Sequence, residues 1–134
     1  MNPSLINWLA VVAAALSGFV VGGIWYSPIL FANAWMADSN ITKEQGQQSN
    51  KAKIFGFTTL FLLIMSANLA AFLATPATTP AWGAQAGCLA GIWTFSAIAI
   101  HSLFEQKSWR YIFINGGYSL VSLTLMGFIL GLWR

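Results

Sequence analysis

The only histidine of the chain, His101, stands four residues before a glutamate, Glu105. Residues four apart lie on the same face of a helix, so an imidazole and a carboxylate would be neighbours there. Such a pair can act as acid and base, or it can close a helix end as an interfacial ion pair. A nearby carboxylate favours the charged imidazolium and burial disfavours it, so the sequence leaves both the charge and the role of the pair open.

Little else in the sequence points to catalysis. No nucleophile, metal-ligand cluster or phosphate-binding loop accompanies His101 and Glu105. The single cysteine, Cys88, lies inside an apolar run, which excludes an intrachain disulfide and a zinc site built from several cysteines. We therefore assign no catalytic residue, no metal site and no cofactor, and an intramembrane enzyme using His101 and Glu105 is kept only as an alternative.

The composition is that of a membrane protein. Of the 134 residues 57% are hydrophobic and only 7% are charged, whereas soluble domains carry about 25% charged residues. The net charge of +3 would suit nucleic acid only if the basic residues were clustered, and they lie instead between apolar runs. We expect the lipid bilayer as partner, no nucleic acid, and a single domain over residues 1–134.

Four apolar runs are long enough to cross a bilayer, which requires about 20 residues. They predict an all-α integral membrane protein, an antiparallel bundle of four transmembrane helices. The first run lacks the basic start of a signal peptide, so we expect it to remain as an anchor. The predicted spans cover residues 5–26, 53–74, 81–104 and 111–133.

The first span is predicted to end at Trp25 and Tyr26, because such aromatic residues settle at the lipid headgroups and Pro28 follows. Ser27 could then cap a short interfacial helix that has Pro28 at its first position. This turn opens the interfacial and cytoplasmic segment, residues 27–52.

The same segment contains a second helix signal. Thr42 and Gln45 have the spacing of a capping box, in which each side chain bonds the backbone of the other. We expect a helix to start there and to run into the second span.

Charge predicts the orientation. The first and third connections hold five of the six basic residues, and only Arg134 lies on the other side. Short loops rich in lysine and arginine stay in the cytoplasm, so both termini are predicted to lie outside.

Glycines recur at intervals of four residues along the predicted spans. Such stripes allow close backbone contact, either within one subunit or between subunits. We expect a homo-oligomer, with a two-fold dimer as the default, in which the last pair of glycines packs between subunits. The stripe residues are Gly18 and Gly22, then Gly83, Gly87 and Gly91, then Gly127 and Gly131.

The predicted topology brings three features to one membrane depth: the end of the first span, the pair His101 and Glu105, and the start of the fourth span. Aromatic walls with converging polar groups are typical of a ligand site, although such groups can also satisfy one another in a structural cluster. The predicted cluster consists of Trp25, Tyr26, His101, Glu105, Arg110, Asn115 and Tyr118.

These residues also carry a resemblance. Gly22 and Gly23, the Trp-Tyr-Ser-Pro stretch from Trp25, the downstream Phe31 and Trp35, then His101, Phe104-Glu105 and the Asn-Gly-Gly-Tyr stretch from Asn115 stand in this order. The chain resembles an uncharacterised family of small bacterial membrane proteins, domain of unknown function 1761, over nearly its whole length. The family's usual glycine after that phenylalanine is replaced by Ala32. The resemblance implies a four-helix bacterial membrane protein and implies no activity. We expect the protein in the bacterial inner membrane.

Three functions stay open from the sequence. The first is a structural or accessory subunit that docks on other membrane proteins through its small residues. The second is transport or binding of a small molecule or ion by an oligomer, which is weakened because no span has a charged residue in its middle. The third is the intramembrane enzyme mentioned above.

Overall fold

The structure, a computed structural model, describes all 134 residues and contains helices and connections only. Four helices are long and apolar enough to cross a membrane, which confirms the predicted all-α fold with four spans. They are α1 (Trp8–Trp25), α4 (Lys51–Phe72), α5 (Pro80–Phe104) and α6 (Trp109–Leu132). The short helices are η1 (Pro3–Leu5), α2 (Ala32–Ser39) and α3 (Lys43–Gln48).

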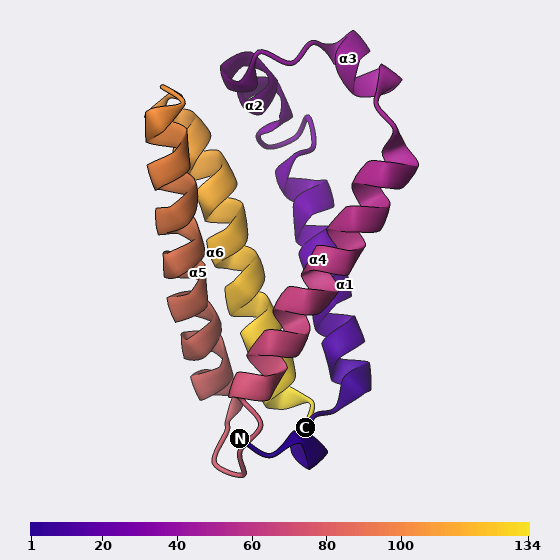
Figure 1. The fold of residues 1–134 in the computed structure, drawn as a ribbon, viewed down its shortest axis with the longest axis vertical. Coiled ribbons are helices and arrows are strands. Elements are labelled where there is room, and N and C mark those ends of the chain that lie inside the picture. Colours follow the sequence, from indigo (N-terminus) through magenta and orange to yellow (C-terminus); the bar gives the residue numbers. More distant parts are fainter.

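The long helices form two pairs, as Figure 1 shows. Helices α5 and α6 run side by side along their whole length, whereas α4 crosses α1. Helix α6 also packs against α1, so it joins the two pairs. Helices α2 and α3 lie over one end of the bundle, and both chain termini lie at the other end (Figure 1).

Polar side chains set where the long helices begin. Each caps a backbone N–H that has no partner inside the helix. Asn50 caps α4 and Ser108 caps α6, so each of these spans starts two residues before the predicted position. Asn7 caps α1 and Thr79 caps α5 in the same way.

The short helix after the first span is present, but its predicted start was wrong. Ser27 does not cap it, because the Ser27 hydroxyl donates a hydrogen bond back to the carbonyl of Ile24. Its own carbonyl accepts the N–H of Ala32, and the chain turns back on the end of α1 before α2 begins. Helix α2 therefore starts five residues after Ser27, with no side-chain cap.

The capping box at Thr42 and Gln45 is confirmed, with both reciprocal hydrogen bonds formed. The helix it starts does not run into the second span, however. Helix α3 ends at Gln48, Ser49 is extended, and Asn50 caps a new helix. The strong cap at Asn50 explains why the chain has two helices here instead of one.

Glycine faces hold α5 against α6. A Cβ atom added to Gly83 or to Gly127 would overlap the backbone carbonyl oxygen of the other residue, and one on Gly87 would overlap that of Leu123. A Cβ atom on Gly131 would lie 2.6 Å from the carbonyl oxygen of Thr79. The prediction that Gly127 and Gly131 pack between subunits was therefore wrong, because their face is filled by α5 of the same chain.

Small residues also bring α1 against α4 and α6. Ala10 and Ala14 are almost completely buried in this core, and the Ser66 hydroxyl donates a 2.8 Å hydrogen bond to the carbonyl of Val11. A Cβ atom on Gly18 would meet side chains of Met126 and Leu62 within 3 Å. The first glycine stripe thus packs within the subunit as well.

Candidate functional site

Two aromatic residues at the end of α1 are held by the start of α6. The Trp25 indole Nε1 donates a 2.8 Å hydrogen bond to the carbonyl of Ile114. The Tyr26 hydroxyl donates a 2.6 Å hydrogen bond to Oδ1 of Asn115. Gly117 allows this approach, because a Cβ atom there would lie 3.0 Å from the Trp25 ring.

A second tyrosine ties α6 back to α1. The Tyr118 hydroxyl donates a 2.9 Å hydrogen bond to the carbonyl of Gly18, and the Tyr118 and Tyr26 rings lie 5.6 Å apart. The Tyr118 ring passes over Gly22, where a Cβ atom would meet it at 3.3 Å. Both tyrosine hydroxyls therefore donate their proton within the protein, which makes this cluster structural in its present form.

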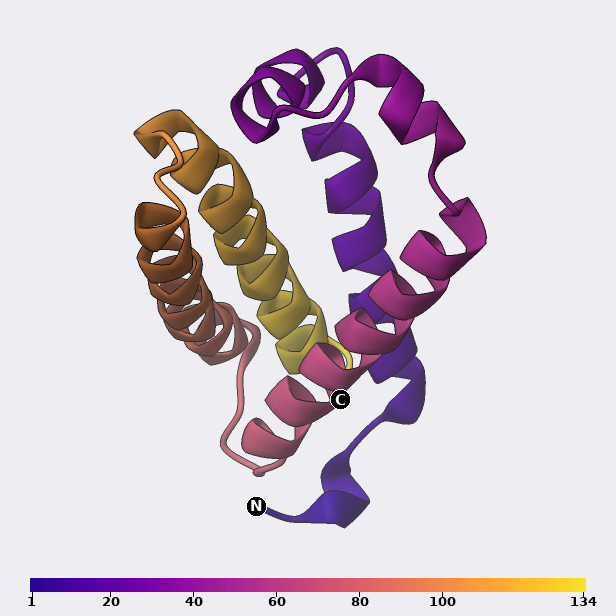
Figure 2. The ribbon, with the colours of Figure 1, turned by 45° about the horizontal axis from the view of Figure 1, so that its top comes forward.

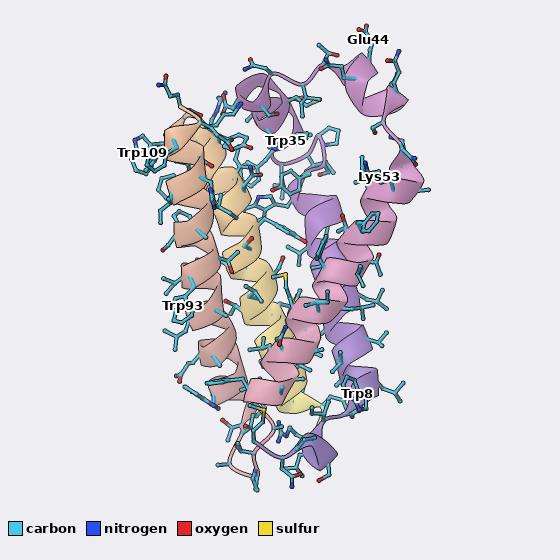
Figure 3. The ribbon with its side chains drawn as sticks, viewed as in Figure 1. Trp8, Trp35, Glu44, Lys53, Trp93 and Trp109 are labelled. Carbon is cyan, nitrogen blue, oxygen red and sulfur yellow. The ribbon has the colours of Figure 1, made fainter.

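Helix α2 covers the cluster. Its Trp35 ring lies 5.7 Å from the Tyr26 ring, nearly edge to face, and Phe31 lies 4.9 Å from Trp25. Figure 3 shows Trp35 on the side of α2 that faces the long helices. Aromatic pairs of this geometry add about 1 kcal/mol each beyond the area they bury.

An ion pair fastens the far end of α2. Arg110 at the start of α6 donates two hydrogen bonds of 2.6 and 2.7 Å to the carboxylate of Asp38. Planar pairing of this kind orients both side chains. The hydrogen bonds from Arg110 lower the pKa of Asp38 below its ordinary value of 3.8. Asp38 is therefore charged at neutral pH.

Beside this cluster α1, α4 and α2 enclose a cleft of about 650 Å³. Its polar groups are few: the hydroxyls of Tyr26 and Tyr118, the Lys51 ammonium at the start of α4, and the Thr58 hydroxyl, which makes no hydrogen bond. The cleft is lined by Phe19, Gly22, Gly23, Tyr26, Trp35, Lys51, Ile54, Phe55, Thr58 and Tyr118. An apolar cleft with a few polar groups is the usual make-up of a ligand site.

The structure brings five of the seven predicted cluster residues together and leaves two apart. His101 and Glu105 are exposed, line no part of the cleft and make no side-chain hydrogen bond or ion pair. The side of α5 that carries Gly83, Gly87 and Gly91 and packs against α6 does not extend to His101 and Glu105. The α5–α6 contact passes instead through Phe95, which lies over Gly116, and the buried Ser102, so His101 points away from α6.

Sequence reasoning missed four residues that matter here. Trp35 and Phe55 form walls of the cleft, Lys51 is its cation, and Asp38 is the partner of Arg110. Asp38 had a usable signal, because it and Arg110 carry opposite charges in connections predicted on the same side. Phe55 had none, since nothing in an apolar span distinguishes a residue at a cleft from one facing lipid.

Comparisons with known proteins give a family and no activity. Neither the curated proteins nor the solved structures include a match to this chain. The family model described as "protein of unknown function (DUF1761)" matches residues 9–131, which include the aromatic cluster and all but the two outermost residues of the four spans. On this match the chain belongs to that uncharacterised family.

Proposed function

We propose that this protein binds a small amphipathic molecule in the cleft between α1, α4 and α2. The observation that carries the proposal is the cleft of about 650 Å³, which is apolar along its walls. Its polar groups include the Thr58 hydroxyl, which is free, and the Lys51 ammonium, which spends one hydrogen bond on the carbonyl of Gly46 and has two further hydrogens to donate. The ligand has an apolar chain, which the aromatic walls exclude from water, and an anionic head, which Lys51 attracts.

The position of the cleft along the bundle supports this ligand class. Trp109 and Trp35 lie at the same end of the molecule as Lys53, and Trp8 lies near the other end (Figure 3). Tryptophans settle at the headgroup level, so the two ends mark the two surfaces of the bilayer. Lys51 then lies among headgroups while Gly22 and Phe19 lie deeper, the arrangement that an amphipathic molecule requires.

The location is proposed as the bacterial inner membrane, with the cleft on the cytoplasmic side and both termini outside. Five of the six basic residues lie in or beside the connections at the cleft end, which favours this orientation. A cysteine introduced at Gln47 should be labelled only after the cells are opened. Labelling from outside intact cells would show that the protein has the opposite orientation, with the cleft in the outer leaflet.

Two other functions are weaker. Transport would use the same cleft but also requires a path from the cleft to the opposite membrane surface. The buried core, which includes Ala10, Ala14 and Leu69, closes such a path. A structural or accessory role is the second candidate, because α4 and α5 present an apolar groove outside this site.

A substitution that fills the cleft with a larger side chain tests the proposal. Gly23 lines the cleft, and a Cβ atom there meets nothing within 4 Å, so Gly23→Leu adds bulk to the cleft without a backbone clash. Gly56→Leu is the matched control, because Gly56 is equally open but lies outside the cleft. Binding is measured by native mass spectrometry with lysophosphatidylglycerol and with lysophosphatidylcholine, which share a chain but differ in net charge.

The wild type and Gly56→Leu should retain lysophosphatidylglycerol in preference to lysophosphatidylcholine. Gly23→Leu should lose about tenfold in affinity, a change that corresponds to about 1.4 kcal/mol. Lys51→Gln should remove the preference for lysophosphatidylglycerol over lysophosphatidylcholine, while both lipids still bind through their acyl chains. Equal retention by Gly23→Leu and the wild type would reject the cleft as the site.

A further inference from the structure

The cleft between α1, α4 and α2 is polar at both ends and apolar between them. Lys51 lies at its outer end, where α1 and α4 diverge towards α2 and α3 (Figure 2). The rings of Phe19 and Phe55, which lie 5.7 Å apart, form apolar walls further in. Thr58 follows on α4 at the inner end. A ligand that fills the cleft therefore meets a polar side chain at each end.

The inner end of the cleft is closed. One turn beyond Thr58 on α4, Leu62 is buried, and a Cβ atom added to Gly18 of α1 would lie 2.9 Å from its side chain. The Tyr118 hydroxyl lies at this level, because it donates its hydrogen bond to the carbonyl of Gly18. Two hydroxyls, those of Thr58 and Tyr118, therefore line the closed end.

Thr58 keeps its hydroxyl free, unlike other residues of its kind in the spans. Serine and threonine in a helix can bond a carbonyl one turn earlier in the same helix. Thr59, the next residue, does so with a 2.8 Å hydrogen bond to the carbonyl of Phe55. The Thr58 hydroxyl lines the cleft and makes no hydrogen bond. Residues that follow the pattern of Thr59 are Ser17, Thr94, Ser96 and Thr124.

The two hydroxyls complement a hydroxyl group of a ligand. The Thr58 O–H can donate to the ligand oxygen, because it has no partner inside the protein. The Tyr118 proton is already donated to Gly18, but the Tyr118 oxygen can accept a hydrogen bond from the ligand. A methyl group in this place would leave the Thr58 hydroxyl unpaired and shielded from water, which is unfavourable.

The spacing along α4 sets the position of that group on the ligand. Lys51 and Thr58 are seven residues apart, so they lie on one face of the helix, about 10 Å apart, roughly the length of an extended ten-carbon acid. We infer that the ligand of this cleft carries a hydroxyl group about 10 Å from its anionic head, and that Thr58 and Tyr118 hydrogen-bond this hydroxyl group. The inference rests on the proposed function and narrows the ligand to hydroxylated amphipathic molecules.

Three acids with the same chain length test the inference: decanoate, 10-hydroxydecanoate and 3-hydroxydecanoate. The affinity of each is measured by its displacement of a fluorescent fatty acid from the purified protein in mild detergent. Thr58→Val keeps the shape of the side chain and removes the hydroxyl, whereas Thr58→Ser keeps the hydroxyl. Thr59→Val is the matched control, because the Thr59 hydroxyl bonds its own helix and lies outside the cleft.

The wild type should prefer 10-hydroxydecanoate to the other two acids. Thr58→Val should lower the affinity ratio of 10-hydroxydecanoate to decanoate by about 3- to 10-fold, the effect of one hydrogen bond. The ratio for 3-hydroxydecanoate should not change, because its hydroxyl lies beside the head. Thr58→Ser and Thr59→Val should keep the wild-type preference. Since ratios are compared between variants, the different partition of the acids into detergent cancels.

Two results separate a failure of this inference from a failure of the proposed function. If Thr58→Val affected all three acids equally, or if Thr59→Val caused the same loss, the inference would be overturned. The cleft would remain the binding site as long as Gly23→Leu weakened all three acids. If Gly23→Leu changed none of the affinities, the proposed function would fail and the inference with it.

Discussion

The two helix pairs of this molecule are built in opposite ways. Between α5 and α6 the backbones touch, because Gly83, Gly87 and Gly127 present no side chains at the contact. Between α1 and α4 the contact is close only at one end, where Ser66 bonds the carbonyl of Val11. At the other end the rings of Phe19 and Phe55 separate the two helices. The closely packed α5–α6 pair, which we call the scaffold, leaves no space between its helices, and the cleft opens beside the α1–α4 pair.

The aromatic cluster joins these halves. Trp25, Tyr26 and Tyr118 connect α1 to α6 by hydrogen bonds to backbone and to Asn115, so the end of α1 is fixed to the scaffold. Helix α4 has no hydrogen bond to α6 at that level and makes one wall of the cleft. The cleft exists because one helix is fastened and its neighbour is not.

The largest effect should come from breaking the close pair. Gly127→Leu places a side chain against the backbone of Gly83, which cannot move aside, and overpacking of this kind costs about 3 kcal/mol or more. Loss of folded protein is expected, measured by thermal unfolding in mild detergent. Gly56→Leu, where the added Cβ atom meets nothing within 4 Å, should leave stability unchanged or slightly raised. If Gly127→Leu stayed folded and only converted a dimeric wild type into monomers, the Gly127 face would lie between subunits.

A smaller effect is expected where the halves are joined. Tyr26→Phe removes the hydroxyl that bonds Asn115 and leaves a half-buried amide oxygen unpaired, at a cost of about 1–3 kcal/mol. Tyr111→Phe is the control, since the Tyr111 hydroxyl makes no hydrogen bond and its ring contact with Lys107 is kept. Adding Asn115→Leu to Tyr26→Phe should restore part of the stability. Two independent, additive losses would indicate that this hydrogen bond does not couple the helices.

The smallest effect concerns the cover over the cleft. The Arg110 hydrogen bonds lower the pKa of Asp38 in the folded protein, so the ion pair stabilises α2 fully at every pH above the ordinary value of 3.8 and is lost as pH falls below it. Hydrogen exchange of Ala32–Ser39 should be insensitive to this group between about pH 5 and 8. Asp38→Asn should raise exchange in α2 and leave α5 unchanged. A response of α2 centred near neutral pH would show that another group controls it.

How much the sequence predicts differs along the chain. The spans, the capping box at Thr42 and the position of Trp25 and Tyr26 follow from local signals, which need no knowledge of neighbouring helices. Local signals do not predict which helix packs on a glycine face. Gly127 allows equally close approach by a helix of its own chain and by a helix of another subunit. His101 was placed by continuing a straight helical face, and the contact line between α5 and α6 drifts away from it before the helix ends.

The end of the bundle opposite the cleft has a mechanical consequence. Arg134 donates hydrogen bonds to the carbonyls of Leu73 and Thr75, and the N–H of Asn2 donates to the carbonyl of Ala74. These bonds hold one end of α4 as a pivot, while its other end carries Lys51. Helix α4 is about 33 Å long at 1.5 Å per residue, so a rotation of about 5° at the pivot displaces Lys51 by about 3 Å. A tilt of α4 about its tied end would therefore change the width of the cleft most at Lys51 and least near Phe72.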